Sequence, residues 1–171
     1  MRFLNFLRTA VYLEVGLIIT FTHELTTHVG LNALTSFGIG FALVNVFVTM
    51  VQKRKLTDVE TLPLTTVALL VALVAAQVPA ALGGLVYRVL VAAWGFISGG
   101  IEFELGRRAG YKTPKGRDHL ISLVLNFALG ILFAAIHLGP RDAVGFLGAY
   151  MILTAVHTGI AIYSQDNPKS A

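Results

Sequence analysis

Long apolar segments alternate with short polar ones along almost the whole chain, and this pattern sets the expected architecture. A helix that crosses a bilayer needs about 20 mostly apolar residues in succession. Such segments are predicted near residues 4–23, 31–51, 62–78, 83–105, 118–138 and 142–163. The third is the shortest and begins beside Pro63, a residue tolerated in the first turn of a helix. The pattern therefore predicts an all-α membrane protein, with six transmembrane helices in one integral membrane domain over residues 1–171.

Glycine and proline punctuate the very short connections within three pairs of helices. Gly30 lies between the first two helices, Pro79 between the third and fourth, and Gly139-Pro140 between the last two. Each pair is therefore predicted to be an antiparallel hairpin. An aromatic residue followed by small residues recurs in the second helices: Phe37-Gly38, Trp94-Gly95, and Tyr150 with Thr154-Ala155. We interpret the three hairpins, residues 4–52, 62–106 and 118–164, as repeats with a period of roughly 55 residues.

The composition agrees with a lipid environment. Hydrophobic residues make up 56% of the chain and charged residues only 13%, and the mean hydropathy is +0.76. A soluble domain carries about a quarter charged residues, because its surface must face water. So much apolar surface cannot be buried in one small protein core, so we expect lipid to cover most of it.

Lys and Arg are distributed unevenly over the connections. If six helices alternate in direction, only Arg88 and Arg141 fall on one side of the membrane. The other basic residues share the opposite side: Arg2, Arg8, Lys53, Arg54, Lys55, Arg107, Arg108, Lys112, Lys115, Arg117 and Lys169. Cytoplasmic loops carry the excess of basic residues, so both termini are predicted to be cytoplasmic. Because the basic residues lie beside apolar segments, their excess over Asp and Glu does not indicate nucleic acid as a partner.

The chain has no cysteine, which excludes disulfides, thiol nucleophiles and cysteine-based metal sites. Arg2 and Arg8 precede an apolar stretch, as in a signal peptide. A small-x-small cleavage pattern is missing there, because polar residues 23–27 follow. We therefore expect the first apolar segment to remain as a helix.

Two histidines and a carboxylate lie between the first two helices, in His23-Glu24-Leu25-Thr26-Thr27-His28. Zinc proteases use H-E-x-x-H, in which histidines four residues apart share a metal on one helix face. The spacing here is five, which turns the second histidine about 140° away from the first. We interpret His23, Glu24, His28 and His137 as a polar cluster on the outer face, with a loop-borne metal site that includes His137 as the alternative. No cofactor is expected.

Glu14 lies near the middle of the first helix. A carboxylate inside a bilayer is costly and normally faces the interior of the bundle. Other polar residues expected at similar depth are Asn45, Asn126, Ser98, Thr154 and His157. If they converge, Glu14, Asn45, Asn126 and His157 form a protonatable intramembrane site for a proton or a small polar solute. The alternative is a hydrogen-bonded cluster that fixes helix packing.

The segment after the fourth helix is strongly charged. Glu102 and Glu104 precede Arg107 and Arg108, and we interpret them as a solvated cytoplasmic rim. The basic loop from Arg107 to Arg117 is expected to attract anionic lipid headgroups. A cytoplasmic position alone would also account for these basic residues. Small residues one turn apart allow close helix contacts, which we expect within the chain, with a homo-oligomer as the alternative. They are Gly95 with Gly99, Ser36 with Gly40, and Gly145 with Ala149.

The C-terminal half resembles the HdeD family, short-repeat membrane proteins named for an acid-resistance protein of enteric bacteria. The resemblance is carried by Trp94-Gly-Phe-Ile-Ser-Gly-Gly-Ile-Glu102, by Leu120-Ile-Ser-Leu-Val-Leu-Asn-Phe-Ala-Leu-Gly-Ile-Leu132, by the Gly139-Pro140 turn, and by Gly145-Phe-Leu-Gly-Ala-Tyr-Met-Ile-Leu-Thr-Ala-Val-His-Thr-Gly159. The N-terminal half shares only the hairpin architecture, and its residues 23–28 replace the usual proline-containing turn. The resemblance implies a six-helix protein of the bacterial inner membrane that is loosely tied to acid stress.

The sequence contains no phosphate-binding loop, nucleophile elbow or paired histidines four residues apart. We therefore expect a non-enzymatic, HdeD-like membrane protein that contributes to envelope integrity or stress tolerance. The alternative is a small channel or transporter with Glu14 and His157 on its pathway.

Overall fold

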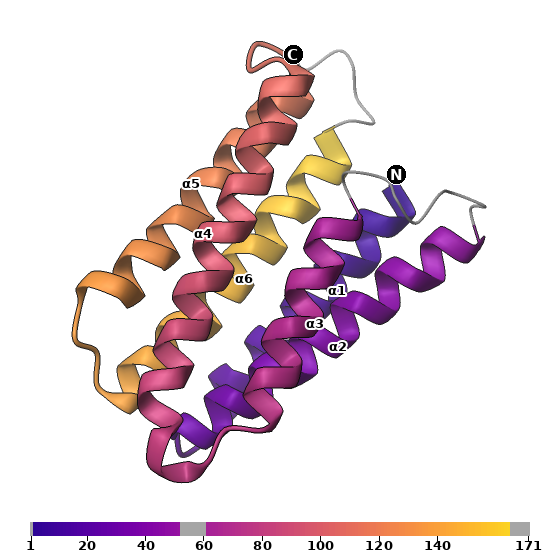
Figure 1. Cartoon of the computed structure of the whole chain (residues 1–171). Coiled ribbons are helices and arrows are strands. Elements are labelled where there is room, and N and C mark those ends of the chain that lie inside the picture. Colours follow the sequence, from indigo (N-terminus) through magenta and orange to yellow (C-terminus); the bar gives the residue numbers. More distant parts are fainter. Residues whose placement is uncertain (1, 52–60, 165–171) are drawn as a thin grey trace.

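The computed structural model describes residues 2–51 and 61–164, and this part of the chain is helical without strands. The helices are α1 (Arg2–Phe21), α2 (Thr27–Val51), α3 (Leu62–Ala76), η1 (Ala80–Leu82), α4 (Gly83–Ala109), α5 (Pro114–Ala135) and α6 (Pro140–Ser164). Figure 1 shows α1 to α6 packed side by side as one elongated bundle. The predicted all-α fold is confirmed.

Among the described residues, five helices are long and apolar enough to cross a membrane: α1, α2, α4, α5 and α6. The 15 residues of α3 span about 22 Å, less than the hydrocarbon thickness of about 30 Å. The prediction extended this helix to residue 78, but α3 ends at Ala76. The cause is Pro79, because the residue before a proline is disfavoured in helical conformation. A short 3₁₀ turn, η1, then leads into α4.

The connection between α4 and α5 is much shorter than the basic loop predicted from the sequence. Gly110, whose φ is +82°, ends α4, and Thr113 begins α5 by accepting a hydrogen bond at Oγ1 from the Gly116 amide (3.0 Å). Pro114 takes the first position of α5, where its missing N–H costs nothing. A Cβ at Gly116 would overlap the Gly110 carbonyl, so this tight turn requires glycine.

The two ends of the bundle differ in charge. The start of α1, the end of α6 and the α4–α5 turn lie at one end, and the turns within the three hairpins lie at the other (Figure 1). Basic residues at the first end include Arg8, Arg107, Arg108, Lys112, Lys115 and Arg117, whereas Arg88 and Arg141 belong to the second. Lys53, Arg54, Lys55 and Lys169 lie outside the described residues. We call the first end the basic end.

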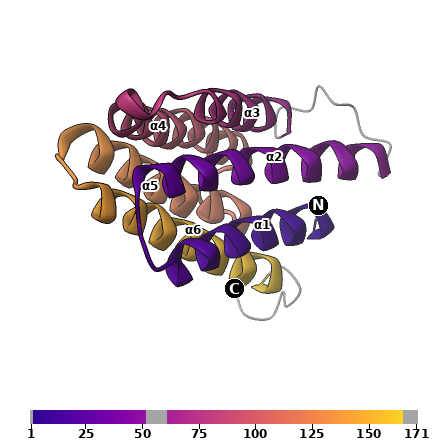
Figure 2. The ribbon, with the colours of Figure 1, turned by 90° about the horizontal axis from the view of Figure 1, so that it is seen from below.

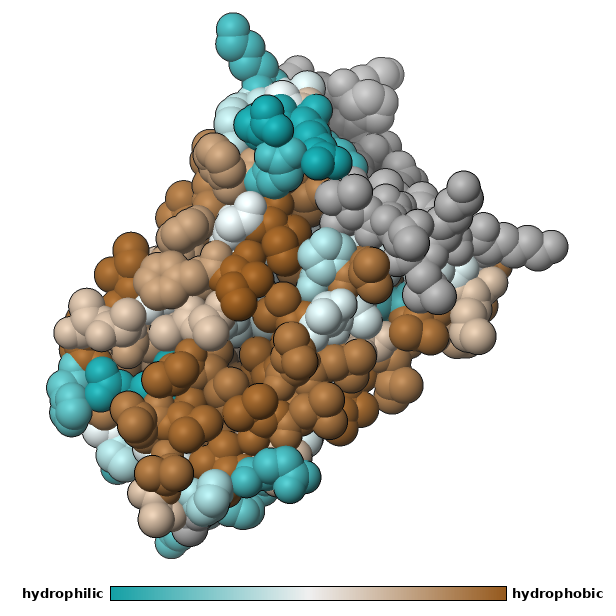
Figure 3. Space-filling model, viewed as in Figure 1, coloured by the Kyte–Doolittle hydropathy of each residue, from teal (hydrophilic) through white to brown (hydrophobic). Residues whose placement is uncertain are grey.

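A hydrophobic belt separates these two polar ends (Figure 3). Large apolar side chains point outward from the helices, among them Phe6, Phe21, Leu43, Met50, Leu73 and Ile160, which are 61–81% exposed. Exposed apolar surface of this extent is covered by lipid in a membrane and would aggregate in water. The protein is therefore a multi-pass, all-helical membrane protein.

The three hairpins pack in a cyclic order. The closest helix pairs are α2 with α3, α4 with α5, and α6 with α1, so the second helix of each hairpin packs on the first helix of the next. Figure 2 shows α6 beside α1 and α3 beside α2. The second helices α2, α4 and α6 also contact one another at the centre. This arrangement matches what three stacked repeats would form.

Glycines on the central helices allow these close contacts. A Cβ on Gly38 would meet the carbonyl oxygen of Ala68 in α3, and a Cβ on Gly95 would lie 2.6 Å from the carbonyl oxygen of Asn126 in α5. On α6, a Cβ on Gly148 would lie 2.7 Å from the Ile19 side chain of α1. Each central helix therefore has a glycine at a close contact with the first helix of a neighbouring hairpin, and the predicted correspondence of Tyr150 with Phe37 and Trp94 stays a prediction.

A cluster of aromatic side chains fills the centre of the bundle at middle depth. Phe37 is fully buried and its ring lies 4.8 Å from Tyr12 and 5.1 Å from Trp94, measured between centroids. Phe41 and Tyr150 complete the cluster, at 6.0 Å from Trp94 and 6.3 Å from Tyr12, respectively. Tilted and edge-to-face pairs of this kind are favourable beyond their burial. This aromatic cluster, residues 12, 37, 41, 94 and 150, is the floor of the site described next.

Candidate functional site

A polar cavity of about 140 Å³ lies between the aromatic cluster and the basic end. Its polar lining comes from four helices: Arg8 on α1, Ser98 and Glu102 on α4, His119 and Asn126 on α5, and His157 on α6. The lining extends from Tyr12, in the aromatic cluster, to Asn5, Lys115 and Ala161 near the basic end. The cavity therefore reaches from that end into the hydrophobic belt.

A chain of hydrogen bonds connects the cavity floor to the core. Trp94 donates from Nε1 to the Tyr150 hydroxyl (3.3 Å), which donates to Oδ1 of Asn126 (2.8 Å). The Asn126 amide in turn donates to the Ser122 carbonyl oxygen (2.8 Å). All the polar groups of this chain lie inside the bundle, where an unpaired donor or acceptor is costly. The chain therefore fixes the orientation of the side chains at the floor.

Arg8 is held inside the bundle by α2. Its Nε donates to Oδ1 of Asn45 (2.7 Å), and the guanidinium carbon lies 5.2 Å from the centre of the Phe41 ring. Asn45 is fully buried and donates from Nδ2 to the Thr65 hydroxyl on α3 (2.8 Å). Asn45 thus links α1 to α3 through α2 and positions a cation on the cavity wall.

Glu102 and His119 face each other across the α4–α5 contact. His119 Nδ1 and Glu102 Oε2 are 2.6 Å apart, and both side chains are mostly buried, at 16% and 17% exposure. At this distance the two side chains share a hydrogen bond, in which an ionised Glu102 carboxylate would accept from Nδ1. Nearby, His157 on α6 contacts the carbonyl oxygen of Asp118 through Nε2 (3.2 Å). Titratable groups from α4, α5 and α6 therefore meet in one polar cavity.

The structure brings together part of the intramembrane site expected from the sequence. Asn126 and His157 line the cavity, and Asn45 lies behind it as the partner of Arg8. Glu14 does not belong to the site: it is exposed on the outer side of α1 and is not part of the cavity lining. The prediction that Glu14 faces the bundle interior was therefore wrong, because its position along the helix gave its depth but not its face.

Three residues of the site were missed: Arg8, Glu102 and His119. Glu102 was expected on a solvated rim, but it points into the cavity. A signal for this was present, because Trp94, Ser98 and Glu102 follow one another at four-residue intervals and share one face of α4. His119, Ser122 and Asn126 form a similar stripe on α5.

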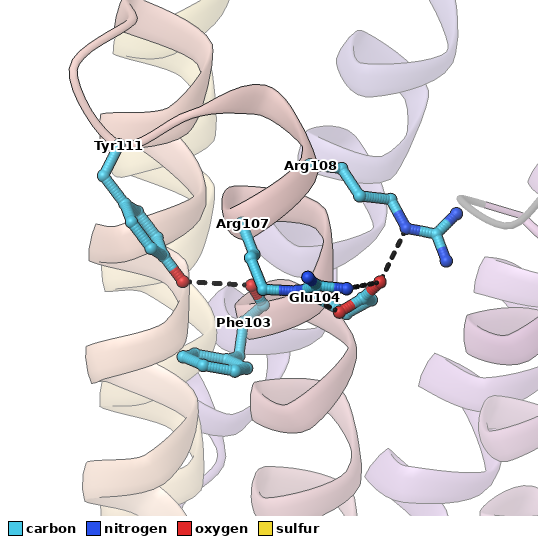
Figure 4. Close-up of polar contacts among 5 residues, drawn as sticks. All are labelled: Phe103, Glu104, Arg107, Arg108 and Tyr111. Atoms are coloured by element: carbon cyan, nitrogen blue, oxygen red, sulfur yellow. Dashed lines mark hydrogen bonds and ion pairs between the residues drawn. The ribbon is translucent and has the colours of Figure 1, made fainter.

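Glu104, unlike Glu102, lies on the exposed rim as predicted. Its carboxylate accepts from Arg107 Nε (2.8 Å) and Arg108 Nε (2.7 Å), which are 64% and 55% exposed (Figure 4). Tyr111 donates from its hydroxyl to the Phe103 carbonyl oxygen (3.1 Å) and so ties the α4–α5 turn to α4. This rim borders the basic end and takes no part in the cavity lining.

No hydrogen bond or ion pair joins the four described residues that were expected in an outer-face cluster, His23, Glu24, His28 and His137. His137 Nδ1 contacts Arg88 Nη1 (3.0 Å), and His28 Nδ1 contacts Asn32 Nδ2 (3.1 Å), one turn later in α2. His23 and Glu24 are exposed in the α1–α2 connection. Among the residues that the structure describes, His, Asp and Glu nowhere gather in a group of three that could hold a metal ion. The alternative of a loop-borne metal site with His137 is thus not supported by the geometry.

Comparisons with known proteins give no family. No protein-family model matches the chain, and neither a curated protein nor a solved structure shows a significant match to it. The site itself is therefore the basis for an assignment. It combines charged groups, two histidines and several hydroxyls inside a hydrophobic belt, and this is the chemistry of a site for a small polar molecule.

Proposed function

We propose that the protein is a non-enzymatic membrane protein that binds a small polar solute in this cavity and acts as a carrier or channel for it. The observation that carries the proposal is the set of buried polar atoms without a hydrogen-bond partner. Ser98 Oγ, Thr154 Oγ1 and His119 Nε2 are such atoms, and all three residues line the cavity. A bound solute or water would satisfy them, whereas a dry structural cluster would leave this cost uncompensated.

The aromatic cluster favours a carrier over an open channel. The cavity reaches Tyr12 and Phe41, and behind them Phe37 and Trp94 are packed with almost no exposure. Passage of a solute toward the other end would require these rings to move apart. A carrier that changes conformation around a fixed site meets this requirement. In an open channel, the rings of the aromatic cluster would have to stay apart.

Cysteine labelling tests whether the cavity contains water. The chain has no cysteine, so a single Ser122→Cys variant places one thiol on the cavity wall. The matched control is Val124→Cys, two residues later on α5, where the side chain is 60% exposed toward lipid. Thiols react as thiolates, which form in water and not in hydrocarbon. A charged, water-soluble thiosulfonate should therefore label position 122 in liposomes much faster than position 124.

The outcome of this labelling decides the proposal. Fast labelling at 122 with slow labelling at 124 supports a hydrated cavity. Equal and slow rates at both positions, in variants that keep the native tryptophan fluorescence, would show a closed packing cluster and refute the solute site. The side from which the reagent reaches position 122 also tests orientation.

A structural role related to the HdeD family is the second candidate. It is supported by the cyclic packing of the three hairpins and by the resemblance of residues 94–159 to that family. In this case the protein contributes to envelope integrity or acid and stress tolerance in the bacterial inner membrane through packing and partner contacts. A cavity-filling variant such as Ser98→Leu would then keep acid survival as long as it folds.

The membrane orientation follows from charge. We place both termini in the cytoplasm, because the basic end carries most of the described Lys and Arg residues. Arg107, Arg108, Lys112, Lys115 and Arg117 would then face anionic lipid headgroups, at about 1 kcal/mol for each basic residue near the surface. Labelling of cysteines in the α4–α5 turn from the outside of intact cells would contradict this orientation.

Glu14 supports a homo-oligomer. Its carboxylate lies on the outer face of α1 at middle depth, beside exposed Leu13, Leu17 and Ile18. A carboxyl group that faces hydrocarbon is costly, so a polar partner from a second copy would stabilise it. Cross-linking of Leu17→Cys in the membrane would detect this contact. A purely monomeric cross-linking pattern would remove the oligomer from the proposal.

A further inference from the structure

We infer that the solute is uncharged and both donates and accepts hydrogen bonds, as a small polyol or amide does. This inference rests on the proposed function, because it requires the cavity to be a solute site. The groups that would hold the solute are Ser98 on α4, Thr154 on α6 and His119 on α5. They are the buried atoms of the cavity that have no partner in the described part of the chain.

The hydroxyls of Ser98 and Thr154 differ from those of other helical residues. Threonines inside helices of this protein commonly donate to the carbonyl oxygen four residues earlier: Thr9, Thr20, Thr35, Thr49, Thr65, Thr66 and Thr158 do so. Ser98 and Thr154 do not, although they are only 2% and 7% exposed. Thr154 lies beside the Tyr150 hydroxyl but makes no hydrogen bond of acceptable geometry to it. Both hydroxyls are therefore available to donate or to accept.

His119 adds a third polar atom to the cavity. Its Nδ1 is bound to Glu102, so Nε2 is the ring nitrogen left for a ligand. Nε2 is buried without a partner, and His119 lines the cavity. A solute with hydroxyl or amide groups, which can donate as well as accept, would complete the site. Because the hydroxyls of Ser98 and Thr154 carry no charge, they favour an uncharged ligand over an ion.

The charged groups of the lining strengthen this conclusion, because they already have partners. Arg8 is bound to Asn45 and stacks on Phe41, and Glu102 is bound to His119. Lys115 and Asp118 are each engaged in interactions as well. The lining carries two cationic and two carboxylate side chains, and an ion entering the cavity would have to displace one of these contacts. A neutral solute would not.

The size of the cavity limits the solute to a few heavy atoms. An apolar cavity of about 150 Å³ accommodates a molecule of benzene's size. At about 140 Å³, the cavity can hold a molecule such as glycerol or urea, whereas a disaccharide is too large. The narrow size range makes sucrose a suitable control for viscosity and osmotic effects.

Protection of the Ser122→Cys thiol tests the inference. The labelling rate is measured in liposomes with glycerol, urea, acetate, methylammonium or sucrose. Occupancy lowers the free fraction by 1 + [L]/Kd, so a solute at about ten times its Kd should slow labelling about tenfold. We expect protection by glycerol or urea, and none by the two ions or sucrose. Adding Ser98→Ala should weaken protection about two- to tenfold, whereas Ser36→Ala, an exposed helical serine, should leave it unchanged.

The results separate this inference from the proposed function. Protection by acetate or methylammonium but not by glycerol or urea would refute the inference that the solute is uncharged. The proposal of a solute site would still stand. Rapid labelling that no small solute slows would also overturn the inference. Absence of labelling at position 122 would refute the cavity itself. Protection that survives in Ser98→Ala, with tryptophan fluorescence unchanged, would refute the assigned binding groups.

Discussion

The contact between α4 and α5 depends on a glycine whose replacement can be predicted quantitatively. A Cβ at position 95 would lie 2.6 Å from both the Asn126 carbonyl oxygen and the Gly130 nitrogen. Ordinary contacts begin at 3.4 Å, so the shortfall, 3.4 minus 2.6, is 0.8 Å. The obstructing atoms belong to the backbone, which cannot rotate away as a side chain can. Gly95→Ala must therefore push α5 away from α4 or distort one of the helices.

The energetic cost follows from this overlap and from the choice of control. Overpacking a close contact costs about 1–3 kcal/mol, while replacing glycine by alanine inside a helix gains roughly 1 kcal/mol. Gly100→Ala is the matched control, because it lies on the same helix and a Cβ there meets no atom within 4 Å. Both variants gain the same helix propensity. The difference between their free energies of unfolding therefore measures the cost of the close contact at Gly95. We expect Gly95→Ala to be less stable than Gly100→Ala by about 1–3 kcal/mol.

The assay uses the single tryptophan of the chain. Trp94 is 1% exposed and lies next to position 95, so its fluorescence reports the integrity of this contact. Unfolding by SDS in mixed micelles should show a lower midpoint for Gly95→Ala and an equal or higher midpoint for Gly100→Ala, compared with the wild type. If the two variants unfold at the same SDS fraction, the backbones of α4 and α5 do not approach closely at Gly95, and the placement of Asn126 and His119 would have to be revised.

Three further substitutions test other parts of the structure. Asn45→Leu removes hydrogen bonds to Arg8 and Thr65 and should cost about 1–3 kcal/mol in the same unfolding assay, whereas replacement of the exposed Asn32 should cost less. Glu14→Leu should favour insertion of α1 by about 3 kcal/mol. It should also weaken cross-linking between copies and leave labelling at the cavity unchanged, because Glu14 faces outward. Altered cavity labelling would contradict this outward orientation. Glu104→Gln should not measurably change the unfolding midpoint, because its partners are exposed arginines; a large loss would indicate that the rim is buried in the assembled protein.

Hydropathy was sufficient to predict the helices because a helix that lies in a bilayer must be mostly apolar along its length. The predicted segments correspond to α1 through α6, and the errors are at helix ends, where local chemistry decides. Thr113, Pro114 and Gly110 define a tight turn in a segment that charge alone suggested to be a loop. Their capping signals were present in the sequence, but the density of basic residues outweighed them in the prediction.

The site was less predictable, because depth in the membrane and direction on a helix are separate properties. Glu14 and Glu102 are both acidic residues of apolar helices, yet one faces outward and the other binds His119 inside the bundle. Only the neighbours on the same face distinguish them. Glu102 follows Trp94 and Ser98 on one stripe, whereas Glu14 shares its face with exposed Leu17 and Ile18. The partner of each residue depends on helix packing, which one sequence does not reveal.

The cavity exists where the three hairpins differ. At the α2–α3 contact, Gly38 meets Ala68 and Ala72, and at the corresponding α4–α5 contact Gly95 meets Asn126 and Gly130. The two contacts share one backbone geometry, but α5 presents a carboxamide that binds Tyr150 where α3 presents a methyl group. Three identical polar hairpins would place equivalent polar groups around the whole bundle axis. Three identical apolar hairpins would leave no polar cavity. A polar cavity on one side of the bundle requires repeats that keep their glycine contacts and diverge in the residues beside them.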